Sequence, residues 1–239
     1  MSRDLEFPTL YQTAPHQCPY LEEQTAVNLI LDPTFRVDVR TYQQLLSSGF
    51  RRNGGIFYRP FCNACAECCS VRIPVAEFQP NRAQRRTLAR NADLQMKVAR
   101  PYFSEEHFSL YLKYQALRHP GDSMDDPDPE KYQRFLIDSD VDTLFMEFRT
   151  RDTLVCVAIV DRLPNALSAI YTFYDPLQAK RSAGTFAVLK QVELAQKLGL
   201  TYVYLGYWIK SCDKMSYKSN FRPLERFDTV KAQWLRMRG

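Results

Sequence analysis

The spacing of apolar positions separates a first half of short elements from a second half of longer, regular ones. In the second half, three consecutive runs rich in β-branched and aromatic residues are joined by tight connections, which predicts an antiparallel meander. These runs are residues 143–149, 153–161 and 166–174. Residues 182–198 then have helical apolar spacing and end at Gly199, and residues 201–208 are again strand-like. A meander followed by strand, helix and strand predicts an α+β fold with a mixed sheet.

The first half predicts shorter elements around a cysteine-rich loop. The expected strands are 25–31, 56–59, 69–75 and 94–99, and the expected helices are 39–48, 82–90, 104–118 and 129–137. Arg72 alternates with apolar Val71 and Ile73, so its side chain should point away from the apolar face of its strand. Residues 120–130 hold five acidic residues and three prolines, which predicts a surface loop. We therefore expect a small cysteine-bearing N-terminal domain at 1–118 and a sheet domain at 119–239.

Composition places the chain among ordinary globular proteins, with 45% hydrophobic and 25% charged residues. Its longest apolar run, Leu154–Val160, is far shorter than the ~20 residues that span a bilayer. The N-terminus lacks the apolar core of a signal peptide. These features predict a cytoplasmic protein with no membrane partner.

Positive charge is concentrated in residues 51–100, which hold ten Arg or Lys against three Asp or Glu, in a chain whose net charge is +5. In the expected helix 82–90, Arg82 and Arg86 share one face and Arg85 lies beside them. Such a row of guanidiniums suits a phosphate backbone, so we predict that these three arginines bind RNA. A solvated helix face would explain the same residues equally well.

Four of the seven cysteines fall within eight residues, in the pattern Cys62-x₂-Cys65-x₂-Cys68 followed by Cys69. Three thiolates on one tight loop suit Zn²⁺ or an iron–sulfur cluster, and both remain open. Each of these sites needs a fourth ligand, which Cys18 or Cys69 can supply. We take Cys18 with the first three as the expected metal site, with nearby arginines favouring the thiolate form. The alternative is reduced cysteines that pack as small apolar residues.

The segment from Tyr174 to Trp208 has the strand–turn–helix–strand outline of the GNAT acyltransferase fold. Proteins of that fold bind acetyl-CoA with an Arg/Gln-x-x-Gly-x-Gly/Ala loop. Here the loop is Arg181-Ser-Ala-Gly184-Thr-Phe, with a single glycine. We therefore expect an acyl-transfer scaffold that does not use acetyl-CoA.

Several segments, taken in order over nearly the whole chain, resemble the aminoacyl-tRNA–protein transferases of the arginyltransferase family, in particular the bacterial aspartate/glutamate leucyltransferase branch. They are Cys18-Pro-Tyr-Leu21, Gly49-Phe-Arg-Arg52, Tyr58-Arg-Pro60 with the cysteine loop, Val71-Arg-Ile-Pro-Val75, Ser168-Ala-Ile-Tyr171, Tyr174-Asp-Pro176, Ser182-Ala-Gly-Thr185, Tyr204-Leu-Gly-Tyr-Trp-Ile209 and residues 214–225. Eukaryotic relatives have a second cysteine where this chain has Leu21, which leaves the ligand set open.

This resemblance implies an enzyme of the N-degron pathway. It would transfer leucine from leucyl-tRNA to proteins that begin with Asp or Glu, and so mark them for degradation. It also implies a GNAT-like C-terminal domain that accepts aminoacyl-tRNA in place of acetyl-CoA. Two other functions remain open from the residues alone: a non-catalytic RNA-binding metalloprotein and a CoA-dependent N-acetyltransferase.

The implied reaction is aminolysis of an ester by an α-amine of pKa ~8, which must first lose a proton. Asp161 and Asp175, which follow predicted strands, are candidates for orienting or deprotonating the amine. Tyr171 or Tyr207 is a candidate donor to the developing oxyanion. Turn aspartates and core tyrosines would explain the same residues.

Recognition of an N-terminal Asp or Glu requires a cation, and arginine suits a two-point grip on a carboxylate. Arg59 and Arg72 flank the cysteine loop and are the expected contacts to the acceptor. Lys214 and Lys218 share a face by spacing and are expected to bind tRNA at its 3′ end, with the peptide as the alternative partner.

Overall fold

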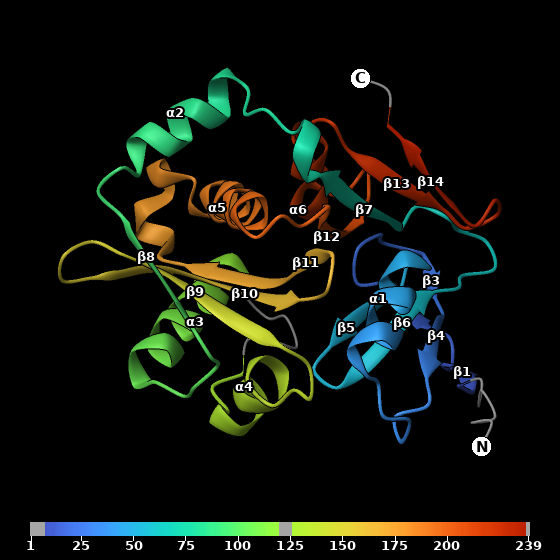
Figure 1. Cartoon of the computed structure of the whole chain (residues 1–239). Helices are drawn as coiled ribbons and strands as arrows, with labels where there is room; N and C mark the ends of the chain where they lie inside the picture. The colour runs from blue at the N-terminus through green and yellow to red at the C-terminus, as the bar shows by residue number, and fades with distance from the viewer. Residues whose placement is uncertain (1–7, 120–125, 238–239) are drawn as a thin grey trace, which may run out of the picture.

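A mixed sheet of eight strands forms the centre of the computed structural model, which describes residues 8–119 and 126–237 (Figure 1). The strands lie in the order β14, β13, β7, β12, β11, β10, β9, β8. Their bounds are β7 Cys69–Pro74, β8 Gln95–Ala99, β9 Thr143–Arg149, β10 Leu154–Arg162, β11 Ala166–Tyr174, β12 Tyr202–Trp208, β13 Glu225–Asp228 and β14 Gln233–Arg236. The predicted α+β class with a mixed sheet is confirmed.

The predicted meander is present as β9, β10 and β11, each antiparallel to the next. Helix α5 (Ala183–Lys197) then leads to β12, which pairs with β11 in parallel. Two parallel neighbours need such a crossover connection. Strand β10 is apolar over most of its length because successive side chains, such as those of Cys156 and Val157, enter clusters on opposite faces of the sheet.

Helices cover both faces of the large sheet (Figure 1). On one face lies α5, whose Phe186 packs against Phe148 of β9, with α2 (Arg82–Arg90) packed against α5. On the other face, α3 (Glu105–Arg118) and α4 (Pro129–Leu136) bury Tyr111 and Tyr132 against Phe173 of β11. The shorter helical segments are η1 Val75–Glu77, η2 Pro176–Arg181, α6 Asp213–Ser216 and η3 Tyr217–Asn220.

A second, smaller sheet lies beside the large one and has the strand order β1, β4, β6, β5. Its strands are β1 Leu10–Gln12, β4 Asn28–Leu31, β5 Arg51–Asn53 and β6 Ile56–Pro60. Helix α1 (Val39–Ser47) packs Tyr42 and Leu46 into a cluster with Leu31 and Phe57 of this sheet. A two-stranded hairpin, β2 (His16–Gln17) with β3 (Thr25–Ala26), completes the region.

The domain boundary expected at residue 118 does not coincide with the boundary between the two sheets. Strand β7, which follows the cysteine loop, lies between β12 and β13 in the large sheet, and β8 forms its edge beside β9. Val71 and Ile73 of β7 are fully buried in the cluster around α5. The small sheet therefore ends at β6, and the large sheet begins with β7.

Most predicted element bounds agree with the structure to within two residues. Asn81 caps α2 with a reciprocal capping box to Gln84, as a helix start needs. The strand predicted at 25–31 is split into β3 and β4. Of the predicted acidic loop, residues 120–125 lie outside the described part of the chain. No helix of the described residues is long and apolar enough to cross a membrane.

The parallel strands β11 and β12 pair over three residues only, and the last pair is Ser168 with Tyr204. Beyond this pair both strands continue, β11 to Tyr174 and β12 to Trp208, without a ladder between them. Gly206 interrupts the register of β12 with β7 and has a φ of +81°, a conformation that glycine adopts without strain. Strands β11 and β12 are thus unpaired with each other toward their C-terminal ends, and we call this the gap between the two strands.

Candidate functional site

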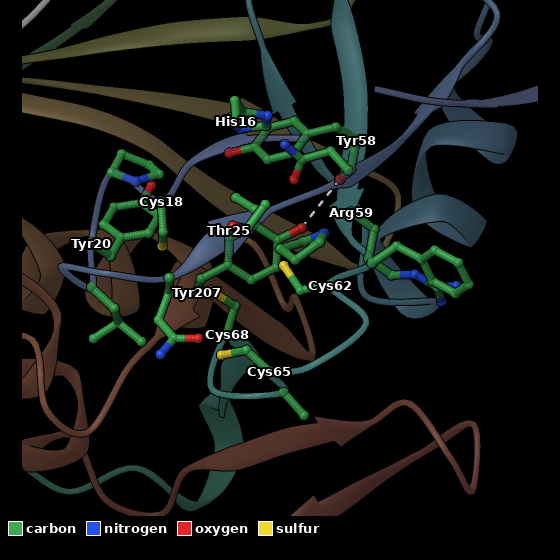
Figure 2. Close-up of a pocket in the computed structure, with 18 of the residues that line it drawn as sticks. His16, Cys18, Tyr20, Thr25, Tyr58, Arg59, Cys62, Cys65, Cys68 and Tyr207 are labelled. Carbon is green, nitrogen blue, oxygen red and sulfur yellow. Dashed lines mark hydrogen bonds between the residues drawn. The ribbon is translucent and has the colours of Figure 1, made fainter. Parts of the chain in front are cut away.

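A cavity of about 530 Å³ lies between the small sheet, the β2–β3 hairpin and the cysteine loop. Figure 2 shows Tyr20, Tyr58 and Arg59 around it, with Tyr207 reaching in from β12 of the large sheet. The cavity therefore lies where the two sheets meet. It is lined mainly by aromatic, aliphatic and sulfur-containing side chains, with Arg59 as its only charged lining residue among those the structure describes.

All four predicted metal ligands, Cys18, Cys62, Cys65 and Cys68, line this cavity (Figure 2). Burial raises the pKa of Cys68 to about 12, and the neighbouring cysteines add to the rise. Cys68 is thus a neutral thiol in the metal-free arrangement. Across residues 8–119 and 126–237, no three His, Cys, Asp or Glu side chains converge in a way that could hold a metal ion. The metal site therefore stays a prediction, and the reaction proposed below does not use a metal ion.

Tyr207 is the predicted catalytic residue that the fold brings to the cavity. Its hydroxyl lies 3.1 Å from the carbonyl oxygens of both Gly49 and Tyr58, and can donate to one of them at a time (Figure 2). Burial raises the pKa of Tyr207 well above its ordinary value, so the side chain is a neutral phenol at physiological pH. It can therefore act as a hydrogen-bond donor.

Arg59, the first predicted contact to the acceptor, lines the cavity, and its guanidinium lies toward Ser48 and Phe50. Its Nη1 donates a 3.0 Å hydrogen bond to the carbonyl of Ser48, and its guanidinium lies 5.1 Å from the ring centre of Phe50. Its Nε is buried without a hydrogen-bond partner. The side chain thus keeps an unused donor near the cavity, with no carboxylate bound to it among the described residues.

Arg72, the other predicted acceptor contact, lies away from the cavity. Its Nε donates to Glu225 at 2.8 Å, and its guanidinium lies 3.6 Å from the ring centre of Tyr202 and 4.2 Å from that of Trp234. These partners leave no face of the guanidinium for a substrate, so the structure does not support this prediction. Sequence reasoning missed the β13–β14 hairpin, which supplies Glu225 and Trp234.

Asp161 is fully buried at the end of β10 in an ion pair. Its two carboxylate oxygens accept hydrogen bonds from Arg52 at 2.8 and 2.7 Å, and further bonds from Tyr42 and Thr143. Arg52 belongs to β5 and Tyr42 to α1, so this carboxylate joins the small sheet to the large one. The geometry favours a structural role over the predicted role as a base.

Tyr171 and Asp175 lie toward α3 and not in the cavity. The Tyr171 hydroxyl donates to Gln115 of α3 at 2.9 Å. Asp175 caps the η2 segment through the backbone N–H of Leu177 and pairs with Lys113 at 2.7 Å. The four predicted catalytic residues are thus distributed over separate parts of the fold.

The predicted tRNA-binding cations divide into exposed and buried ones. Arg82, Arg85 and Arg86 are exposed on α2, and Lys214 is exposed near His119. Lys218, by contrast, is 8% exposed, and its Nζ donates to the carbonyl of Tyr207 at 2.5 Å. Burial lowers its pKa to about 7. The structure does not support a contact between this buried amine and tRNA.

Arg51 is the residue near the cavity that sequence reasoning passed over. It is buried, its Nη2 donates to the carbonyl of Ala169, and its Nη1 has no hydrogen-bond partner. The resembling segment Gly49-Phe-Arg-Arg52 contains it, but the pattern does not reveal which of the two arginines finds a carboxylate. In the structure Arg52 has one, and Arg51 has none within the described residues.

Comparison with known proteins gives two family models that together match most of the chain. The arginine-tRNA-protein transferase N-terminus model matches residues 16–86, and the C-terminus model matches residues 106–228. An aspartate/glutamate leucyltransferase of Pseudomonas fluorescens (strain Pf0-1) is 49% identical over 225 residues, 94% of this chain and 95% of that protein. One from Pseudomonas savastanoi pv. phaseolicola is 48% identical over 215 residues, 90% of this chain and 92% of that protein.

Among solved structures, the C-terminal domain of a putative lysylphosphatidylglycerol synthetase from Agrobacterium fabrum aligns with a TM-score of 0.50. The two chains are 12% identical, and the match covers 80% of this chain and 65% of that one. At this identity the likeness concerns the fold alone.

Proposed function

Because this chain belongs to the arginine-tRNA-protein transferase family, we propose that it transfers leucine from leucyl-tRNA to proteins that begin with Asp or Glu. This transfer marks its acceptors for degradation in the N-degron pathway of the cytoplasm. The observation that carries the proposal is the near full-length identity of 49% to an aspartate/glutamate leucyltransferase. The arrangement of cations around the cavity supports it.

The cavity suits an acidic acceptor because arginines lie on and beside its wall and no carboxylate lines it in the described part of the chain. Arg59 lies on its wall, and Arg51 lies near the Tyr58 and Tyr207 side chains that line it. An N-terminal Asp or Glu would supply the negative charge that neither arginine finds within the described residues.

Leucyl-tRNA binding is supported by the exposed arginines of α2 and by Lys214, which can neutralise phosphates. A GNAT-like scaffold agrees with the crossover from β11 through α5 to β12 and with the gap where these strands separate. The single glycine of the segment before α5 agrees with a donor other than acetyl-CoA.

In the reaction, the acceptor's neutral α-amine attacks the carbonyl carbon of the leucyl ester. The ammonium proton has passed to a base before the attack. The new amide bond then forms, the ester bond to the tRNA 3′ ribose breaks, the attacking nitrogen loses one proton, and the leaving ribose oxygen gains one to become a hydroxyl. Tyr207 is the predicted catalytic residue that lies in the cavity as a neutral phenol. To donate to a reacting group, its hydroxyl would exchange its hydrogen bond to the carbonyl of Gly49 or Tyr58 for one to that group.

Incubation of the purified protein with leucyl-tRNA and an Asp-starting peptide tests the proposal. We expect the peptide to gain one leucyl residue at its N-terminus. RNA binding without transfer would favour a non-catalytic RNA-binding protein instead. Acetylation of the peptide from added acetyl-CoA would favour an N-acetyltransferase.

A further inference from the structure

Arg51 extends from β5 of the small sheet into the gap where β11 and β12 separate. Its Nη2 donates a 2.7 Å hydrogen bond to the carbonyl of Ala169, the first β11 residue beyond the paired segment. Its Cζ lies 2.5 Å from the position that a Cβ on Gly206 of β12 would occupy. The guanidinium therefore contacts both strands, and only a glycine at 206 leaves room for it.

Arg51 differs from the buried arginines Arg52 and Arg72 because no carboxylate within the described residues balances its charge. Arg52 is paired with Asp161 and Arg72 with Glu225, whereas Arg51 has no carboxylate partner within residues 8–119 and 126–237. The side chain is only 8% exposed, and its Nη1 donates to nothing. A buried charge without a counter-ion is strongly unfavourable, and an anion from outside the chain would relieve it.

Arg51 lies beside the cavity, because it is the cross-strand partner of Tyr58 in the cavity wall and its guanidinium packs against Gly206, the neighbour of Tyr207. Burial raises the pKa of Tyr58 and of Tyr207, two residues of the cavity wall, and the Arg51 cation opposes this rise in both. The same holds for Tyr20, a third lining residue. Arg51 is thus electrostatically coupled to three side chains that an acceptor in the cavity would contact.

We propose that Arg51 selects acceptors by charge and pairs with the side-chain carboxylate of an N-terminal Asp or Glu. This assignment rests on the proposed transfer to acidic N-termini and names the residue that reads them. The planar guanidinium fork matches a carboxylate, and Nη1 is the free donor. Because Nη1 is enclosed, the acceptor must displace part of the wall around it.

The reaction brings two other anions, and neither fits Arg51 as well. Phosphates of tRNA lie on the outside of a large polyanion and suit exposed cations such as Arg82 and Arg86. The oxyanion on the leucyl carbonyl exists only in the transition state, so it would leave Arg51 unpaired in the substrate-bound enzyme, where an acceptor carboxylate can already pair with it. A carboxylate is charged throughout.

The test compares peptides that begin with Asp and with Asn, which differ in charge but hardly in shape. Their binding to the wild type, Arg51→Gln and the matched cavity variant Arg59→Gln is measured by calorimetry without tRNA, and their transfer rates with leucyl-tRNA. We expect Arg51→Gln to reduce the Asp-over-Asn preference by about tenfold or more, the loss of one charge-assisted pair. Arg59→Gln should reduce it less.

Arg51→Lys keeps the positive charge without the guanidinium fork and should retain part of the Asp-over-Asn preference. Thermal unfolding checks that each variant is folded. If Arg51→Gln does not fold, Arg51→Met provides the same removal of charge, and Arg51→Lys the charge-retaining comparison. An Asp-over-Asn preference that survives loss of Arg51, or that depends on Arg59 alone, overturns the proposal. Charge-dependent peptide binding without leucine transfer would instead overturn the proposed function and leave the Arg51 assignment standing.

Discussion

Asp161 accepts four hydrogen bonds, two from Arg52 and one each from Tyr42 and Thr143, and is shielded from water. A carboxylate so engaged has no free lone pair directed at a substrate. Its position at a strand end is equally typical of a catalytic aspartate, so only the positions of its partners distinguish the two roles. Those partners come from residues more than 100 positions away, except Thr143.

Replacing Asp161 with Asn should strongly destabilise the protein, because it leaves the Arg52 guanidinium buried without its counter-ion. We expect a loss of about 3–5 kcal/mol in the free energy of unfolding, measured by urea denaturation. Asp142→Asn is the matched control, since Asp142 pairs with Arg100 and Arg162 at the surface and should cost about 1 kcal/mol or less. Equal losses in the two variants would contradict the structural role.

Lys218 makes the stability depend on pH. Burial lowers its pKa from 10.5 to about 7, and the ionisable groups that face it are Arg51 and Cys212. Between these two pKa values the unfolded state binds a proton that the folded state lacks, so Lys218 destabilises the fold less as the pH rises. Below about pH 7 both states are protonated and the destabilisation is complete.

Compared with Lys218→Met, the wild type should therefore gain stability from pH 7 to pH 9. Thermal unfolding of both proteins at each pH measures the difference, in which groups common to the two proteins cancel. Parallel stability curves would show that Lys218 does not titrate in this range.

At the scale of elements, long regular segments were predictable from the sequence and short contact-dependent ones were not. The meander and α5 follow from apolar spacing over seven residues or more, and α2 from its Asn81 cap. Strands β5, β13 and β14 span three or four residues and exist through their pairing partners. Because β13 and β14 were not predicted, the contacts of Arg72 with Glu225 and Trp234 were not predicted either.

The need for contacts between distant segments also explains which parts of the candidate site could be predicted. Tyr207, Arg59 and the cysteines were predicted and do line one cavity. The roles of Arg51 and Lys218 depend instead on which side chains lie beside them, and their partners come from other strands and loops. Local patterns carry no information on such pairings.

Helix α2 should act as an electrostatic contact for tRNA. Exchanging Arg82, Arg85 and Arg86 together for Gln should raise the KM for leucyl-tRNA and leave the KM for the peptide unchanged. If each arginine meets one phosphate, the slope of log affinity against log salt should fall by about 2–3. Arg151→Gln, on the turn between β9 and β10, is the control. An unchanged salt slope would assign α2 to an ordinary solvated surface.

At the scale of the whole molecule, the two segments matched by the family models contribute strands to the same large sheet. Strand β7, from the segment 16–86, lies between β12 and β13 of the segment 106–228. The Arg52–Asp161 pair and the Arg51–Ala169 hydrogen bond join the small sheet to the large one. These contacts hold the two sheets together around the cavity at their junction, where we place the acceptor.

The most direct measurement is the initial rate of leucine transfer by the wild type to two peptides that differ only in an N-terminal Asp or Asn. If unpaired arginines bind the acceptor's carboxylate, the rate on the Asp peptide should be about tenfold or more higher than the rate on the Asn peptide, both at subsaturating concentration. Equal rates on the two peptides would contradict the claim that unpaired cations at this junction read the acceptor's charge.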